Sequence, residues 1–388
     1  MCGGIVLAGA LTFGELASRY PQAGGPYVYL REGWGPRVAF LYGWQALLVM
    51  DPAITAALAA GSAEYIVALG PSLAGAERGI AIAIVWALAA LSMLGLRLSA
   101  RLFDTMTAFK VLALGGVVAV AFGAGHGDWA HFQAHPAAPA APPLAEGLAI
   151  GLVSAFFSFA GFWEASRIAG EIRDASRTLP RAFAAGVASI TAIYVATTAA
   201  FIYLVPAGGA MTGSEFAKRA GEAMLGPAGP AVLAAVVVLS VIPSAMALLM
   251  MAPRLYVAMS EDGLFPAALA ARHPRTDVPA RATLLLALLA SVYIAAGTFE
   301  QISSFLVGTA MGFIALAAAA LFPIRRRHPD GSGFRVPGYP TTPILFVVLI
   351  ASVVLMVAMN RPRQALLGLG IVALGWPAYG LAARRDVK

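Results

Sequence analysis

The sequence predicts an all-α integral membrane protein, and three observations carry that prediction. Of its 388 residues, 60% are hydrophobic and only 12% are charged, with a mean hydropathy of +0.80. Soluble globular proteins contain about 45–50% apolar and about 25% charged residues, so a soluble enzyme is excluded. A disordered chain is excluded as well, because disorder needs low hydrophobicity. Finally, the apolar residues fall into eleven long stretches without the alternating pattern of β-barrel strands.

Each of the eleven stretches is predicted to be one membrane-spanning helix, because a span needs about 20 mostly apolar residues. The first stretch is short, and the second is long enough to be tilted or bent at Pro52. Together they form one membrane domain over residues 1–388. In chain order the predicted spans are 2–17, 37–69, 79–97, 104–124, 145–166, 183–205, 228–258, 280–297, 301–322, 341–359 and 363–382.

The basic residues predict the orientation of these spans. If loop 18–36 is cytoplasmic and the sides alternate, cytoplasmic segments hold 20 of the 26 Lys and Arg residues. The outer segments hold five, and Lys110 lies within a span. Cytoplasmic loops of membrane proteins carry such an excess, so the net charge of +7 needs no nucleic acid partner. We therefore expect a multi-pass protein of the cell (inner) membrane, with an external loop 125–144 and a cytoplasmic C terminus.

Three segments carry a family resemblance. Residues 15–36 contain the string ELASRYPQAGGPYVYL followed by GP, residues 157–181 contain FSFAG, AGE and LPR, and residues 254–279 contain RLY and DG. In order and spacing they resemble three parts of the amino acid–polyamine–organocation (APC) superfamily. These parts are the loop after helix 2, helix 6 with the loop that follows it, and the end of helix 8. The resemblance is to the L-amino acid transporter-like branch and covers nearly the whole chain.

The resemblance implies a five-plus-five inverted-repeat transporter fold with about eleven helices, which correspond to family helices 2–12. Residues 1–124 would form the first repeat without its first helix. Residues 145–322 would form the second inverted repeat, and residues 341–383 two C-terminal helices. On this alignment the 388 residues lack family helix 1, which holds half of the family's substrate site. One explanation is that the start codon has been assigned too far downstream or that the sequence is truncated. The other is that the protein has eleven helices.

The same resemblance implies secondary active transport of amino acids by alternating access, and no enzymatic activity. A neutral L-amino acid is the predicted substrate, because the region of the expected site is apolar and aromatic. Two alternatives stay open: a basic amino acid or polyamine transporter, and a non-transporting remnant or sensor of the same fold. The expected partners are the amino acid, the lipid bilayer, and a proton or an exchanged amino acid as coupling partner. No cofactor and no metal site are predicted.

The expected substrate site centres on a helix break at residues 158–161. A break near the membrane midplane frees backbone groups that a substrate can satisfy, and Gly161 permits backbone geometry that bulkier residues resist. By resemblance, Phe157 is an aromatic gate over the substrate. The alternative is an ordinary helix with one glycine. The predicted substrate-binding residues are Phe157, Ser158, Phe159, Ala160, Gly161, Glu164 and Asp51.

Three charged residues are functional candidates, because a charge inside the bilayer is costly. Asp51 would bind an amine or carry a proton, and the alternatives are an internal hydrogen bond or a pair with Lys110. Glu164 would neutralise a cationic side chain or carry a proton, unless it pairs with Arg167 at i+3. By resemblance, Lys110 replaces a bound cation and has a coupling or gating role together with Phe157. Its alternative is snorkelling to the membrane interface.

Overall fold

A computed structural model describes residues 2–133, 151, 155, 158–206, 213–297, 310–331, 333–360 and 362–383. Within these ranges the chain forms helices, turns and loops, and no strand. The α-helices with defined bounds are α1 (Cys2–Arg19), α2 (Pro26–Trp34), α3 (Pro36–Gln45), α4 (Asp51–Leu69), α5 (Glu77–Met93), α6 (Leu96–Gly123), α8 (Ala175–Leu204), α9 (Gly213–Leu225), α10 (Gly229–Glu261), α11 (Ala280–Ala296), α13 (Leu321–Arg327), α14 (Thr341–Asn360) and α15 (Pro362–Ala383).

Six helical stretches of the described chain are long and apolar enough to cross a membrane, and α11 is a shorter apolar helix. This confirms the predicted all-α membrane fold. The count of eleven spans and the inverted repeat stay predictions, and the expected spans 145–166 and 301–322 lie partly outside the described residues. The six stretches are Pro36–Leu69, Leu98–Gly123, Ala175–Leu204, Phe216–Glu261, Thr341–Met359 and Ala365–Ala382.

Several segments expected to be loops contain helix instead. α2 lies within the expected loop 18–36, and two further cases concern α8 and α9. α8 begins at Ala175, eight residues before the expected span, so its first two turns are polar. The expected loop between 205 and 228 contains α9, whose buried Ala220 and Met224 pack with Leu233 of α10. Hydropathy misses both segments, because an amphipathic or polar helix has a low mean hydropathy although one of its faces is buried.

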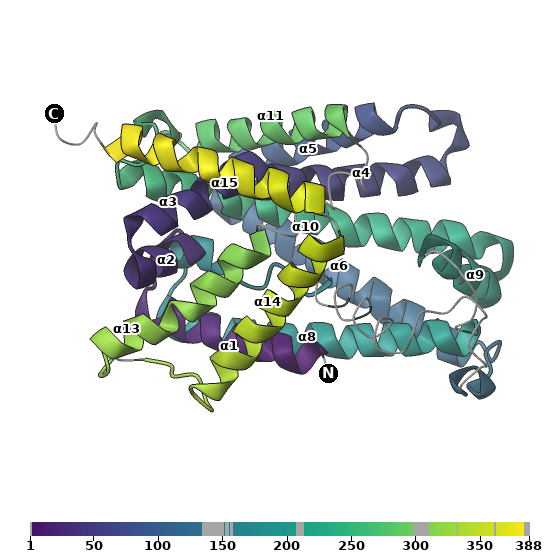
Figure 1. The fold of residues 1–388 in the computed structure, drawn as a ribbon. Coiled ribbons are helices and arrows are strands. Elements are labelled where there is room, and N and C mark those ends of the chain that lie inside the picture. The colour runs from purple at the N-terminus through teal and green to yellow at the C-terminus, as the bar shows by residue number, and fades with distance from the viewer. Residues whose placement is uncertain are drawn as a thin grey trace.

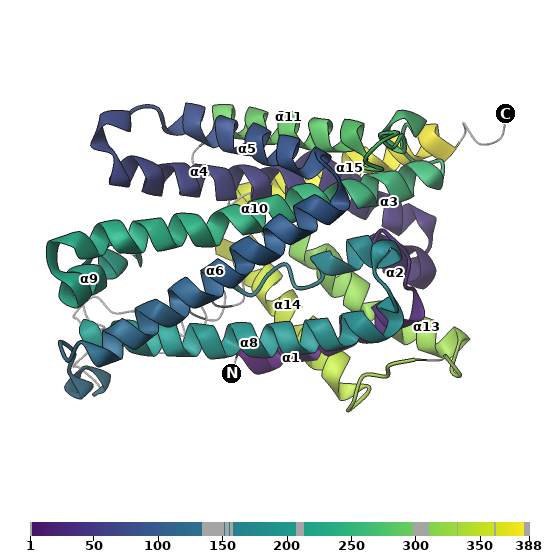
Figure 2. The ribbon, with the colours of Figure 1, turned by 180° about the vertical axis from the view of Figure 1, so that it is seen from behind.

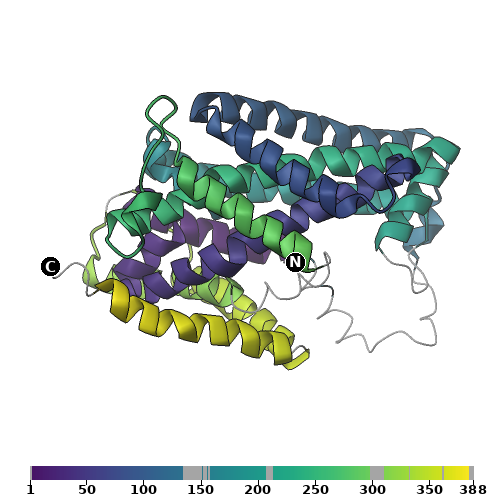
Figure 3. The same cartoon turned by 90° about the horizontal axis from the view of Figure 1, so that it is seen from above.

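Most of the helices lie side by side and extend roughly along one direction, whereas α13 and α14 run obliquely to them (Figure 1). α1 runs along α8 and is crossed by α14, whereas α4 packs against α10, α5 and α11. The view from behind shows α6 crossing α10 (Figure 2), and the view from above shows α15 along one side of the bundle (Figure 3). The loops before α2, after α10 and before α14 meet at one end, far from η3 (Trp129–Phe132) and α9.

Small residues bring these helices together. A Cβ atom on Gly9 of α1 would lie 2.2 Å from the Phe346 ring of α14, and one on Gly3 would lie 2.6 Å from Thr191 of α8. In lipid there is little hydrophobic force between helices, so close backbone approach and van der Waals contact must stabilise the bundle. These glycines therefore position α1 between α8 and α14.

Candidate substrate site

The helix breaks at the segment where the sequence predicts a break. Ser158 is the last helical residue, turns follow, and the 3-10 segment η4 (Glu164–Glu171) begins three residues after Gly161. Gly161 has a φ of +102°, which side-chain-bearing residues rarely adopt. The freed carbonyl of Ser158 accepts a hydrogen bond of 2.7 Å from the Tyr194 hydroxyl of α8. The break is thus stabilised by the backbone conformation of Gly161 and by a hydrogen bond from a side chain. The predicted gate residue Phe157 lies outside the described residues.

A cavity of about 720 Å³ lies beside this break. Ser158 and Phe159 line it from the break, Thr191 and Tyr194 from α8, and Leu114 from α6. The Phe159 and Tyr194 rings meet edge to face, with centroids 5.1 Å apart. None of its described lining residues carries a charge, so its wall offers apolar, aromatic and hydroxyl groups.

A buried charge cluster lies next to the break, and it consists of Asp51, Glu164 and Arg167 with the hydroxyls of Tyr42 and Tyr256. Arg167 Nη1 donates to both carboxylate oxygens of Asp51 at 2.9 Å, and Nη2 donates to the Tyr42 hydroxyl at 2.9 Å. Tyr256 donates to Asp51 Oδ2 at 2.8 Å. Arg167 Nε lies 2.9 Å from Glu164 Oε2, as an ion pair without hydrogen-bond geometry. The side chains of Asp51 and Arg167 are 0% exposed.

Local backbone features place these charges. The π-helical turn Ala46–Met50 interrupts the long span just before Asp51, whose N–H donates to the Ala46 carbonyl. Such π turns recur at functional sites. The loop before α2 packs against η4. Gly24 of this loop donates its N–H to the Arg167 carbonyl at 3.1 Å, and a Cβ atom on Gly25 would lie 2.5 Å from Ser166 Oγ. The glycines of the first motif therefore let its loop pack directly against the backbone that carries Arg167.

The cluster holds two carboxylates and one guanidinium. Burying charges costs desolvation free energy, which only close pairing and further hydrogen bonds offset. Asp51 receives both from Arg167 and Tyr256, whereas Glu164 has the ion pair and one bond of 2.7 Å from Trp163 Nε1. Asp51 is thus neutralised within the protein. Nowhere in the described part do three or more His, Cys, Asp or Glu side chains converge to hold a metal ion.

The structure joins some of the predicted site residues and leaves others apart. Asp51 and Glu164 meet through Arg167, and Asp51 pairs with Arg167 rather than with Lys110. Lys110 lies half-buried on α6 and has no ion pair with any described residue. Arg167 was not predicted as a site residue, because it lies just beyond the expected span 145–166 and resembles a loop residue. Its i+3 spacing from Glu164 was the one local signal.

Residues of the three motifs close one end of the bundle. Tyr27 Oη and Arg31 Nη1 of the first motif each donate to Asp262 Oδ2 of the third at 2.5 Å. Burial and the Asp262 carboxylate raise the pKa of the Tyr27 phenol above its ordinary value, so this group stays a donor. Glu171 of the second motif pairs with the third-motif arginine, Arg254, at 3.0 Å. Three motifs far apart in the chain are therefore one contact network.

The buried carboxylate of Glu15 joins further segments at the same end of the bundle. Glu15 of α1 is fully buried, and its two oxygens accept from Arg325 at 2.9 and 2.5 Å. Arg19 and the Val336 N–H add further hydrogen bonds to it, at 2.9 and 2.8 Å. The guanidinium of Arg325 also lies over the Tyr339 ring, 3.8 Å from its centroid. This end is consequently sealed by buried charged contacts between distant segments.

Comparison with known proteins names the family. The sequence pattern of the amino acid permease family matches residues 1–371 of this chain. The chain belongs to the amino acid permease family. The predicted resemblance to APC-type permeases is therefore confirmed, and the protein is a membrane transporter and not an enzyme.

Named relatives align with 90–100% of this permease. The serine/threonine exchanger SteT of Bacillus subtilis is 27% identical over 395 residues, 99% of this chain and 88% of the relative. The cystine/glutamate transporter of Homo sapiens is 28% identical over 400 residues, 100% of this chain and 78% of the relative. The branched-chain amino acid permease BcaP of Bacillus subtilis is 26% identical over 377 residues, 90% and 77% of the two chains.

Proposed function

We propose that this permease carries neutral L-amino acids across the cell (inner) membrane by secondary active transport with alternating access. The pairing of both buried carboxylates within the protein carries the proposal. A basic amino acid or a polyamine needs a free carboxylate as counter-charge, and Asp51 is already paired with Arg167. Glu164 shares the same guanidinium and contacts the indole of Trp163. Both carboxylates thus have partners within the protein, and neither is left free as the counter-charge of a cationic side chain.

The cavity beside the break supports the same substrate class. Its described lining is uncharged, with Phe159 and Tyr194 as aromatic walls and Thr191 as a polar one. The break at 158–161 supplies backbone groups for the ammonium and carboxylate common to all amino acids. Two of the three relatives above are named for neutral amino acids, and the third for cystine and glutamate.

Uptake of radiolabelled serine and leucine is the direct test of this proposal. The permease, expressed from its complete reading frame, is reconstituted into liposomes. We expect unlabelled neutral L-amino acids to compete with uptake, and arginine, putrescine and glutamate to compete at least tenfold less well (about 1.4 kcal/mol or more), because the described lining offers no counter-charge to their side chains. Equal competition by arginine would favour the basic-substrate alternative. A complete lack of uptake would favour the remnant or sensor.

Lys110 gives a second prediction, which concerns coupling. We infer that its ammonium takes the place of a bound cation, so uptake is driven by a proton or an exchanged amino acid and is unchanged when choline replaces sodium. Support comes from its half-buried position in a span and from the lack of an ion pair among described residues. Lys110→Ala should lower the uptake rate about tenfold without loss of folded protein. The exposed Lys218→Ala is the control, and equal rates in both variants would contradict the coupling role.

The third prediction is the orientation. We infer that the end closed by the motif network is cytoplasmic, because most basic residues lie in the segments expected there. The test uses a Cys2→Ser background and two exposed positions: Gln133, which directly follows η3, and Asp330, which lies in the loop before α14. These two segments lie at opposite ends of the bundle (Figure 1). A membrane-impermeant maleimide added to intact cells should label Gln133→Cys and spare Asp330→Cys. Labelling of the second position alone would invert the topology and place the C terminus outside.

A further inference from the structure

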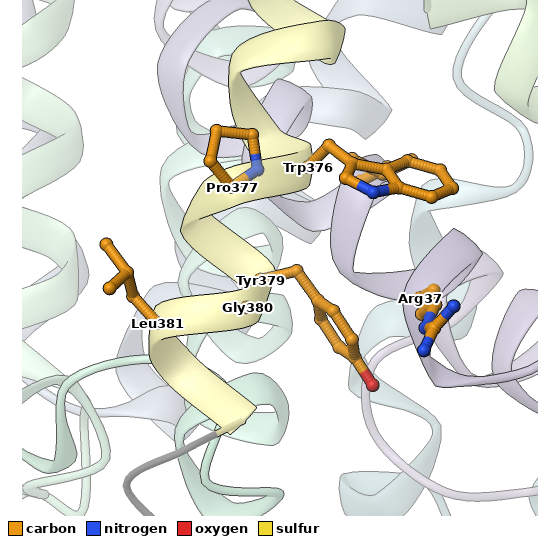
Figure 4. A pocket seen from close by; sticks show the side chains of 7 residues that line it. Arg37, Trp376, Pro377, Tyr379, Gly380 and Leu381 are labelled. Atoms are coloured by element: carbon orange, nitrogen blue, oxygen red, sulfur yellow. The ribbon is translucent and has the colours of Figure 1, made fainter.

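A groove between α3 and α15 exposes hydrogen-bond donors and apolar surface together (Figure 4). Its volume is about 550 Å³. Arg37 and Leu41 line it from α3, and Trp376, Tyr379, Gly380 and Leu381 line it from α15. No carboxylate is among the lining residues, so the groove carries a positive charge that nothing in its wall neutralises.

Three donors of this groove have no partner among the described residues. Figure 4 shows Trp376 and Tyr379 projecting from the side of α15 that faces Arg37. The Arg37 guanidinium lies 5.9 Å from the Tyr379 ring centroid and makes no ion pair with a described residue. The Tyr379 hydroxyl and the Trp376 indole N–H likewise find no hydrogen-bond partner in the described chain, and Trp376 is 63% exposed. A cation and two neutral donors suit an anion that accepts several hydrogen bonds.

The walls of the groove are fixed by packing between the two helices. Trp44 Nε1 of α3 donates to the Ile371 carbonyl of α15 at 3.0 Å. Gly375 permits this approach, because a Cβ atom there would lie 2.9 Å from both Leu41 and Trp44. The Tyr379 ring packs edge to face on Phe40, with centroids 5.4 Å apart. A ligand would therefore meet a preformed surface.

We propose that this groove binds an anionic glycerophospholipid. Its phosphate lies against Arg37, Tyr379 and Trp376, and one acyl chain lies along Leu41 and the α15 side chains. The position fits, because α3 begins at Pro36, next to the loops of the closed end, and α15 ends there. Trp, Tyr and Arg are the residues that mark the headgroup level of a membrane. Basic pockets between transmembrane helices on the cytoplasmic side bind anionic headgroups.

Native mass spectrometry of the delipidated permease in detergent tests this assignment. The protein is titrated with phosphatidylglycerol or phosphatidylcholine of the same acyl chains, and bound lipids are counted. We expect preferential retention of one phosphatidylglycerol. Arg37→Gln should weaken that binding about fivefold, the effect of one basic side chain at a membrane surface. Arg326→Gln removes an equally exposed charge at the same end of the bundle, on α13, and should leave binding unchanged.

A second variant tests the groove without touching its charge. A Cβ atom on Gly380 meets no atom within 4 Å, so Gly380→Leu should fill the groove and leave the fold intact. It should abolish retention of the tightly bound lipid even with Arg37 present. Equal lipid retention by wild type, Arg37→Gln and Gly380→Leu would overturn the proposal. A change of oligomeric state in either variant at a constant lipid count would overturn it too, because the occupant would then be a second copy of the chain.

Discussion

Arg167→Gln should destabilise the permease by about 3–5 kcal/mol, because it leaves Asp51 buried without its counter-charge. Both side chains are 0% exposed, so water cannot replace the lost guanidinium. The same change strips Tyr42 of its donor and Glu164 of its ion pair. The free energy of unfolding, measured in detergent micelles with increasing sodium dodecyl sulfate, checks the effect. Arg177→Gln on the exposed start of α8 is the matched control, with a change of about 0.5 kcal/mol or less.

The double variant Asp51→Asn/Arg167→Gln, compared with the two single variants, measures the interaction energy between Asp51 and Arg167. Removing both charges with amides of similar shape should recover part of the lost stability, because Asp51 no longer leaves a buried charge there. Glu164 still loses its ion pair, which limits the recovery. The coupling energy of such neighbours lies in the range of about 0.5–3 kcal/mol. Strictly additive losses in the single and double variants would show that Arg167 does not neutralise Asp51. The charge argument for a neutral substrate would then fail with it.

Gly161→Val should abolish transport, because the break depends on a backbone conformation that a β-branched residue resists. The φ of Gly161 is +102°, and strained backbone of this kind costs about 1–3 kcal/mol. Space is not the obstacle, since a Cβ atom there would meet only Glu164 Cγ, at 4.0 Å. The variant therefore tests geometry and not a clash. Initial uptake rates in proteoliposomes, with equal amounts of folded protein, are the measurement.

The control for this variant uses the same substitution in a regular helix. Gly186 lies in α8, a Cβ atom there meets nothing within 4 Å, and its φ is not positive. Gly186→Val should keep uptake within about twofold of wild type, because valine is tolerated in a helix at least as well as glycine. If Gly161→Val transported as well as Gly186→Val, the break at 158–161 would not be the substrate site.

Several features of this permease follow from the sequence alone. A chain with 60% hydrophobic and 12% charged residues has to enter a bilayer, and there the backbone must satisfy its own hydrogen bonds, which dictates helices. The break is local too, because glycine in a mid-span segment permits a backbone that other residues resist. Asp51 and Glu164 could be selected because carboxylates inside a membrane are expensive. The roles of these residues in binding stay predictions.

The identities of the partners were decided by the tertiary structure. Asp51 and Arg167 are 116 residues apart, and no periodicity relates them. Arg167 comes directly after the expected span 145–166 and so looks like a loop residue, yet packing of the Gly24–Gly25 loop against η4 encloses it completely. In the same way the contacts of Glu15 with Arg325, and of Tyr27 and Arg31 with Asp262, join segments from opposite ends of the chain. Hydropathy and spacing indicate which residues are unfavourable to bury in a membrane. Only the folded bundle determines which partner group offsets the free energy of burying each of them.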